Sequence, residues 1–153
     1  MDTKAVISLM RDLVHLDVDA IHAYDQAIKN IDVASVRAEL TRYKGDHERH
    51  VTDLSAAIVG LGGDAPPIRR DVKGFFIEGM TALRAAMGTE QSLKAMLTNE
   101  KLTNREYDKA AKMALPPEID ALIRRNHADE QRHLAFIEDA IARRVWERAT
   151  KHA

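Results

Sequence analysis

The 153-residue sequence contains no cysteine, only four prolines and seven glycines, and few aromatic residues. The absence of cysteine excludes disulfides, thiolate zinc sites, iron-sulfur clusters and cysteine nucleophiles, so histidine, aspartate, glutamate and tyrosine remain for chemistry. Neither charge predominates, because the 23 Lys and Arg residues are balanced by 24 Asp and Glu residues. The basic field typical of nucleic-acid-binding proteins is therefore absent. No apolar run of about eighteen residues occurs, and acidic residues interrupt the first twenty positions, so we expect a cytoplasmic protein without a signal peptide.

Helix-forming residues make up most of the sequence, and the glycines and prolines fall mainly between long segments that lack them. We therefore expect one all-α domain over residues 1–153, a four-helix bundle of two duplicated helical hairpins. A crossover at residues 62–88 is long enough to run along the bundle and join two parallel helices. The four long helices are expected at residues 3–30, 32–61, 89–114 and 117–148.

Several residues suit the ends of these elements. Asp32 is a suitable N-cap for the second helix, because its short carboxylate can accept a backbone N–H. The glycines at positions 62 and 63 can end that helix in a left-handed turn. Within the crossover, the pattern of residues 71–88 predicts a short amphipathic helix, with Phe75 and Phe76 among its apolar residues.

Each long helix has a seam of core positions at alternating spacings of four and three, the pattern by which helices pack in a bundle. Near the middle, polar residues interrupt these seams, and an unpaired buried carboxylate costs several kcal/mol. A compensating partner such as a metal ion is therefore expected. The seams run from Val6 to Ile31, Val36 to Leu61, Leu93 to Ala110 and Ile119 to Ala140, and the interruptions include Asp17, His47, His50, Glu100, Glu130 and His133.

The sequence repeats itself at an interval of 83 residues. Between residues 17 and 58, eleven of 42 positions are identical to the residue 83 positions later. The repeat pairs Tyr24 with Tyr107, and the segment DHERH at 46–50 with DEQRH at 129–133. Two hairpins related by a pseudo-twofold axis would bring both polar clusters to the middle of the bundle, where helical bundles build metal sites.

The spacing within each cluster suits metal binding. Residues three apart on a helix project side by side, so His47 with His50, and Glu130 with His133, can each hold a metal ion. Together the six interruptions supply three carboxylates and three imidazoles. This donor set suits two divalent ions of intermediate softness such as iron, manganese or zinc.

These elements resemble the ferritin-like superfamily, in particular di-iron four-helix bundles of the rubrerythrin and bacterioferritin type and a small branch of their bacterial relatives. The resemblance is carried by Asp17-x6-Tyr24, by Glu100-x6-Tyr107 and by the two five-residue segments, which recur at equal intervals of 33 residues. It implies a di-iron centre, with iron as the first choice of metal and manganese or zinc as alternatives. The implied ligands are Asp17, His47, His50, Glu100, Glu130 and His133.

The chain departs from this family pattern at two ligands. Asp17 stands where a terminal glutamate is usual and is one methylene shorter. His47 stands where a bridging glutamate is usual, and a neutral imidazole binds one metal, so we expect Glu130 to bridge and His47 to be terminal. Two divalent ions with three carboxylates then leave a charge of about +1, which favours hydroxide, peroxide or another anion.

The resemblance also assigns two acids behind the ligands. Asp46 is expected to accept the free ring N–H of His133, and Asp129 that of His50. The alternative is that both are solvated surface acids. Each pairing joins the two halves of the repeat, so it depends on the two hairpins facing each other.

The function implied is a metal-dependent redox protein that reacts with oxygen or peroxide, in iron oxidation or in protection against oxidative stress. Tyr24 and Tyr107 would lie one layer from the carboxylates, with a role in the reaction or a purely structural one. The alternatives are a non-catalytic metal-binding stress or interaction module, or an iron-storage protein, which the lack of room for a short fifth helix disfavours. Expected partners are metal ions, a small oxidant and an external electron donor, without nucleic acid or membrane, and a homodimer is a possible assembly.

Overall fold

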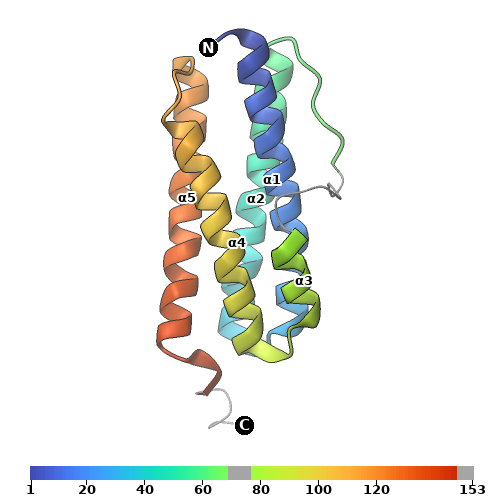
Figure 1. Cartoon of the computed structure of the whole chain (residues 1–153), viewed down its shortest axis with the longest axis vertical. Coiled ribbons are helices and arrows are strands. Elements are labelled where there is room, and N and C mark those ends of the chain that lie inside the picture. Colours follow the sequence, from blue (N-terminus) through green and yellow to red (C-terminus); the bar gives the residue numbers. More distant parts are fainter. Residues whose placement is uncertain (69–76, 148–153) are drawn as a thin grey trace.

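A computed structural model of the chain describes residues 1–68 and 77–147. Within these residues it is an all-α structure without strands, as expected from the sequence (Figure 1). Its helices are α1 (Thr3–Asn30), α2 (Ala34–Gly60), α3 (Ile77–Ala85), α4 (Gly88–Ala111) and α5 (Pro117–Ala142).

The four long helices form two antiparallel hairpins, α1 with α2 and α4 with α5 (Figure 1). Residues 61–68 run from the end of α2 along the side of the bundle, and α3 leads to the opposite end, where α4 begins, so that α2 and α4 are parallel. The two halves of the sequence repeat therefore face each other along the length of the bundle. None of the helices in the described ranges is both long enough and apolar enough to cross a membrane.

The two ends of α2 are held differently from one another. Asp32 is not its N-cap, and that prediction is wrong: the cap residue is Val33, which makes no side-chain cap hydrogen bond. The Asp32 carboxylate instead accepts a hydrogen bond from Thr89 Oγ1 at 2.5 Å, which ties the first hairpin to the start of α4. At the other end the left-handed turn is confirmed, because Gly62 has a φ of 88° and Gly63 N–H reaches back to the carbonyl of Ile58.

Two helices are shorter than the sequence indicates. We expected α4 to reach residue 114 and α5 to reach residue 148, but α4 ends at Ala111 and α5 at Ala142, and residues 145–147 are helical again after a turn. After α5, Arg144 adopts a left-handed φ of 50°, and its N–H bonds to the carbonyl of Ile141, three residues back, which breaks the α-helical ladder. The predicted segment beyond residue 147 lies outside the described residues.

The short helix expected within residues 71–88 is present as α3, and Phe75 and Phe76, which were expected on it, lie outside the described residues. Met80 and Leu83 of α3 are buried in the common core. Close packing against α4 depends on Gly79, because a Cβ there would lie 1.6 Å from Asn99 Oδ1. α3 therefore packs directly against Asn99, the residue before the expected ligand Glu100.

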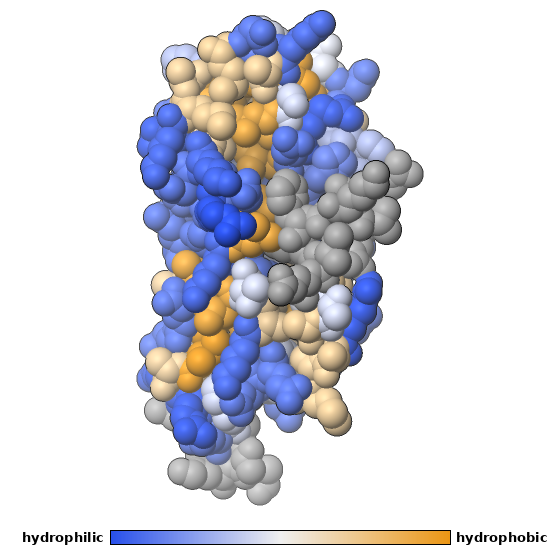
Figure 2. Space-filling view, viewed as in Figure 1, coloured by the Kyte–Doolittle hydropathy of each residue, from blue (hydrophilic) through white to orange (hydrophobic). Residues whose placement is uncertain are grey.

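The seams form the interior of the bundle. All seam positions are buried except Tyr43, Ala57 and Leu61, which are half-buried. Hydrophilic residues cover most of the visible face, with apolar residues in narrow strips between the helices (Figure 2). The polar seam residues are thus enclosed by an apolar core on either side along the bundle axis.

Candidate metal centre

Six titratable side chains meet in the middle of the bundle, and none exposes more than 1% of its surface. One comes from α1, two from α2, one from α4 and two from α5, so every long helix contributes. They form two groups of four that could each hold a metal ion. The six are Asp17, His47, His50, Glu100, Glu130 and His133.

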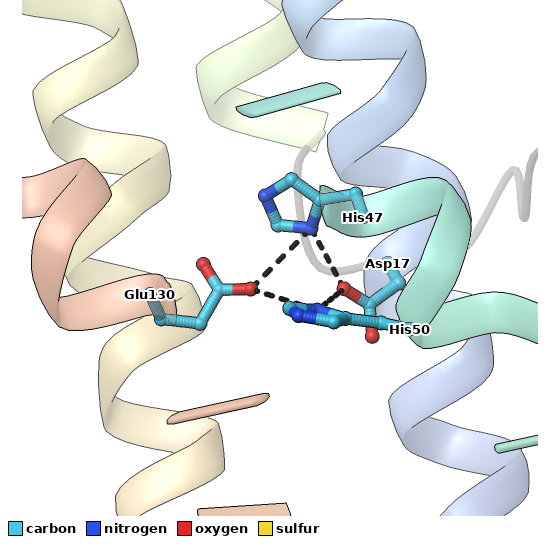
Figure 3. A group of neighbouring side chains, drawn as sticks. All are labelled: Asp17, His47, His50 and Glu130. Atoms are coloured by element: carbon cyan, nitrogen blue, oxygen red, sulfur yellow. Dashed lines mark hydrogen bonds and ion pairs between the residues drawn. The ribbon is translucent and has the colours of Figure 1, made fainter. Parts of the chain in front are cut away.

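The first group comprises Asp17, His47, His50 and Glu130 (Figure 3). Asp17 Oδ1 lies 2.7 Å from His47 Nδ1 and 3.0 Å from His50 Nδ1. Glu130 Oε1 lies 3.4 Å from each of these two ring nitrogens. Two oxygens and two nitrogens therefore surround one point between α1, α2 and α5.

The second group comprises His47, Glu100, Glu130 and His133. Its spacing is wider, because Glu100 Oε1 lies 3.9 Å from both His47 Nε2 and His133 Nδ1. Glu130 Oε2 lies 3.5 Å from His133 Nδ1. His47 and Glu130 belong to both groups, which makes them the link between two candidate metal positions.

Four buried polar atoms of these residues make no hydrogen bond within the described part of the chain: His47 Nε2, both carboxylate oxygens of Glu130 and His133 Nδ1. A buried polar atom without a partner costs roughly 1–3 kcal/mol. Bonds of ~2.0–2.1 Å at a tetrahedral angle separate neighbouring ligand atoms by about 3.4 Å. The 3.4 and 3.5 Å separations around Glu130 match this spacing, so the residues fit a divalent metal ion.

Two buried tyrosines hold the carboxylates of opposite hairpins. Tyr24 on α1 donates a hydrogen bond from its hydroxyl to Glu100 Oε1 on α4. Tyr107 on α4 donates to Asp17 Oδ2 on α1 at 2.5 Å. Burial, and next the negative charge of Glu100 and Asp17 respectively, raise the pKa of each phenol well above its usual value. Both phenols therefore remain protonated donors at neutral pH.

Two aspartates bind the outer nitrogens of the histidines, in the pairs that the sequence predicts. His50 Nε2 lies 2.8 Å from Asp129 Oδ2, and His133 Nε2 lies 2.8 Å from Asp46 Oδ2. Because each acid takes the ring N–H at Nε2, the Nδ1 atoms are the nitrogens that face the other ligands. Burial opposes ionisation of Asp129, but the hydrogen bonds with His50 and Arg132 outweigh it and lower its pKa to about 2.

Two arginines complete this outer layer at the surface between α2 and α5. Arg49 donates to Asp46 at 3.2 Å and also to Asp129. Arg132 donates to Asp129 and lies 3.8 Å from Asp46. The side chains of Arg49 and Arg132 are 45% and 60% exposed, so the ion pairs lie at the boundary between the buried centre and solvent.

The carboxylates strongly favour protonated histidines in the metal-free chain. Burial lowers the pKa of His47, but the charge of Glu130 and a hydrogen bond with Asp17 outweigh burial and raise it to about 10. Burial is likewise outweighed at His50, where the charge of Asp17 raises the pKa to about 12. The pKa of His133 is also raised, against burial, by its hydrogen bonds. Protons therefore supply the positive charge that a metal ion would otherwise supply, and metal binding must displace them.

Two neighbours of the centre were not singled out from the sequence. The ring of Tyr43 stacks on that of His133 at a centroid distance of 4.3 Å, and Asn126 Nδ2 lies 3.5 Å from the hydroxyl of Tyr107. Both are seam positions, and the interval of 83 residues pairs position 43 with position 126. That coincidence was the available signal, since polar seam residues at matched positions face the same centre.

One family model matches the chain over residues 5–113, and its description is "Domain of unknown function (DUF2383)". The match covers well over half of the 153 residues and includes most of α1 and all of α2 to α4, with Asp17, His47, His50 and Glu100. Glu130 and His133 lie beyond the matched range. No curated protein matches the chain.

Proposed function

The chain belongs to the DUF2383 family, and we propose that its bundle is a ferritin-like dinuclear metal protein that reacts with dioxygen or peroxide. The observation that supports it is the pair of overlapping groups of buried ligands. Each group offers two nitrogens and two oxygens, which suits divalent iron, with manganese or zinc as alternatives. Bound ferrous iron would supply the electrons for the reduction of the oxidant.

The residues divide into two sets that the pseudo-twofold axis relates. Asp17 and His50 would hold one ion, Glu100 and His133 the other, and the Glu130 carboxylate would be shared. Around them the apolar seams exclude bulk water, which strengthens the electrostatic interactions within the centre.

The outer residues orient the ligands before metal binds. Asp46 and Asp129 fix the histidine rings with Nδ1 inward. Tyr24 and Tyr107 hold the carboxylates through donated hydrogen bonds, and each phenol has a proton available beside the centre. We propose that these tyrosines also take part in the reaction, and that the reductant is a separate partner.

A non-catalytic metal-binding module is the second candidate. It is favoured by the network of protonated histidines and carboxylates, which compensates the buried charges without a metal ion. In that case metal would stabilise the fold without turnover, by binding only the folded state. The two candidates differ in whether the loaded protein consumes an oxidant.

The test uses protein freed of metal and then loaded with ferrous iron under anaerobic conditions. We expect two irons per chain by elemental analysis, and oxidation on addition of dioxygen or hydrogen peroxide, followed by absorbance. Glu130→Gln should bind neither ion tightly, with affinity lowered more than ~100-fold, since it removes a shared ligand and exceeds the 10–100-fold loss typical of outer partners. Glu48→Gln is the matched control, because Glu48 is exposed on α2.

The outcomes separate the candidates. Two irons that oxidise no faster than free ferrous iron would leave the metal-binding module and exclude the redox function. Iron far in excess of two per chain, in a large shell, would indicate storage. No iron above the level of Glu130→Gln would overturn the metal centre itself.

A further inference from the structure

His47 occupies a special place in the centre, since it faces both metal positions. Its Nδ1 lies 2.7 Å from Asp17 Oδ1 and 3.4 Å from Glu130 Oε1, within the first group. Its Nε2 is on the other edge of the ring, 3.9 Å from Glu100 Oε1 in the second group. That nitrogen is buried and makes no hydrogen bond within the described residues. The two nitrogens of one ring therefore point into two different groups of ligands.

Glu130 presents its two oxygens in the same way. Oε1 lies 3.4 Å from His50 Nδ1, and Oε2 lies 3.5 Å from His133 Nδ1. Residues 47 and 130 are 83 apart, so they are equivalent positions of the repeat, and the other ligands pair likewise across the two halves. Only the pair of positions 47 and 130 belongs to both groups. Position 47 is thus a shared position by symmetry, whichever residue occupies it.

We infer that His47 is a bridging ligand, bound to one metal ion through Nδ1 and to the other through Nε2. This inference rests on the proposed dinuclear centre and is independent of its reaction with an oxidant. To bind two cations the ring releases both N–H protons to solvent and becomes the imidazolate anion, while no electron is transferred. It replaces the expectation from sequence that His47 is terminal on one ion.

The charge of the centre favours this arrangement. With a neutral His47, two divalent ions and three carboxylates leave about +1 in a site that is closed to solvent, which is costly. An imidazolate adds the fourth negative charge and makes the site neutral, as four carboxylates would. No further anion is then needed to balance the loaded centre.

The arrangement also makes the two ions alike in ligands. One would have the nitrogens of His47 and His50 with oxygens of Asp17 and Glu130, and the other has the corresponding four atoms of the second group. Two bonds of ~2.0 Å on opposite sides of a ring that is ~2.2 Å across place the ions about 6 Å apart. Two-metal sites that share an oxygen bridge have separations of only ~3.5–4 Å. A single oxygen atom therefore could not join these two ions.

The experiment measures the separation directly. Metal-free protein is loaded with cobalt(II) alone, crystallised, and examined by anomalous scattering at the cobalt edge. We expect two cobalt ions per chain about 6 Å apart, with the His47 ring between them. His47→Glu should bring the ions at least ~1.5 Å closer, because the rigid ring would no longer hold them apart and both shared ligands would be carboxylates, as in two-metal sites with shorter separations.

A binding measurement on the folded variant provides an independent readout. His47→Ala should keep at most one tightly bound cobalt(II) ion, and added imidazole should restore the second ion and the absorption spectrum of the wild-type protein. His22→Ala is the control, because His22 is exposed on α1. Circular dichroism checks that the His47 variants remain helical.

The outcomes distinguish the bridge from the centre. Two ions less than ~4.5 Å apart, with His47 on only one of them, would overturn the bridge and leave the proposed function standing. One ion or none in the wild-type protein would overturn both. Two ions retained by His47→Ala without imidazole would also exclude a bridging role.

Discussion

The two halves of the metal centre are alike in how they are supported and different in how closely their ligands approach. In each half a tyrosine donates to the carboxylate of the other hairpin, and an aspartate binds the histidine of the other hairpin. The carboxylates themselves differ. Asp17 lies 2.7 and 3.0 Å from its two histidines, whereas Glu100 lies 3.9 Å from both of its own.

This difference shows that the repeat preserves the contacts between hairpins more strictly than the ligands. The short Asp17 side chain makes hydrogen bonds with the protonated rings of His47 and His50, so the ligands of its half already bind one another in the metal-free protein. Glu100 is turned toward Tyr24 and is also contacted by Thr103 Oγ1 at 3.3 Å, in a position where the repeat has Ala20 in the other half. We therefore infer that the ligands of the Glu100 half are held less tightly by hydrogen bonds to one another, and that the two ions bind one after the other.

The largest effect expected is that of pH on this order. Because metal binding displaces ring protons, its affinity should rise about tenfold per pH unit for each proton released below the pKa of that ring. His50, whose pKa is raised to about 12, lies between acceptors at 3.0 and 2.8 Å, whereas the contacts of His133 with its inner carboxylates are longer. The second group should fill first as pH rises. Calorimetric titration with zinc(II) between pH 6 and 8, in buffers of different ionisation enthalpy, measures the protons released.

The stability of the metal-free protein should follow pH in the opposite direction. His47 has its pKa raised from 6.5 to about 10, so its stabilising contribution is complete below pH 6.5 and is lost as pH rises through about 10. Urea unfolding with a chelator present should show a lower free energy of unfolding at pH 10 than at pH 7. Metal affinity that falls with rising pH, or a metal-free fold that gains stability, would contradict the protonated centre.

A smaller effect should come from removing one carboxylate at a time. Asp17→Asn and Glu100→Gln keep the shape of the side chain but weaken it as a ligand, so each variant should retain one ion and lose ~100-fold or more in affinity for the other. In the metal-free protein Asp17→Asn should be the more destabilising, because it leaves two close imidazolium rings without their partner. Elemental analysis and urea unfolding check the two halves separately. Equal destabilisation by both variants would show that the difference in spacing has no energetic consequence.

Much of this arrangement could be predicted from the sequence, because its signals are periodic. The spacing of the seams located the helices and the buried polar residues, and the interval of 83 residues matched Asp46 with Asp129. The family resemblance then paired Asp46 with His133 across the bundle. What depends on local competition could not be predicted. Asp32 accepts a hydrogen bond from Thr89 instead of capping its own helix. α5 ends at Ala142 because Arg144 adopts a left-handed conformation, and the sequence has no glycine there to indicate it.

The structure adds most to the sequence at His47, where the expected terminal role stays a prediction beside the bridging role proposed above. From the sequence, a histidine in place of a glutamate suggests the loss of a bridge, since residue type alone does not say where each ring nitrogen points. The pseudo-twofold position sets that direction, and it turns the two nitrogens toward different groups.

The outer aspartates should differ by a moderate amount. Asp129 has a side chain that is 7% exposed and accepts hydrogen bonds from two arginines and His50, whereas Asp46 is 19% exposed. Replacing an outer partner costs about 10–100-fold in metal affinity, and we expect Asp129→Asn near the upper end and Asp46→Asn near the lower end. Competition titration with a zinc-binding dye measures both. If Asp46→Asn had the larger effect, the ranking of the two halves by burial would be wrong.

The smallest effect should come from the arginines, which touch only the aspartates. Arg49 donates to Asp129 and to Asp46, but its side chain is 45% exposed, and exposed ion pairs contribute about 0–1 kcal/mol. Arg49→Met keeps the aliphatic part of the side chain, so we expect a loss of at most ~1 kcal/mol in stability and a fivefold loss at most in zinc affinity, reduced further by high salt. Arg125→Met is the matched control, since Arg125 is an exposed residue on α5 whose ion pair with Asp53, at 3.4 Å, is its only one among the described residues. A loss of zinc affinity as large as that of Asp129→Asn would mean that Arg49 holds Asp129 in place, and that the surface ion pairs position the ligands of the centre.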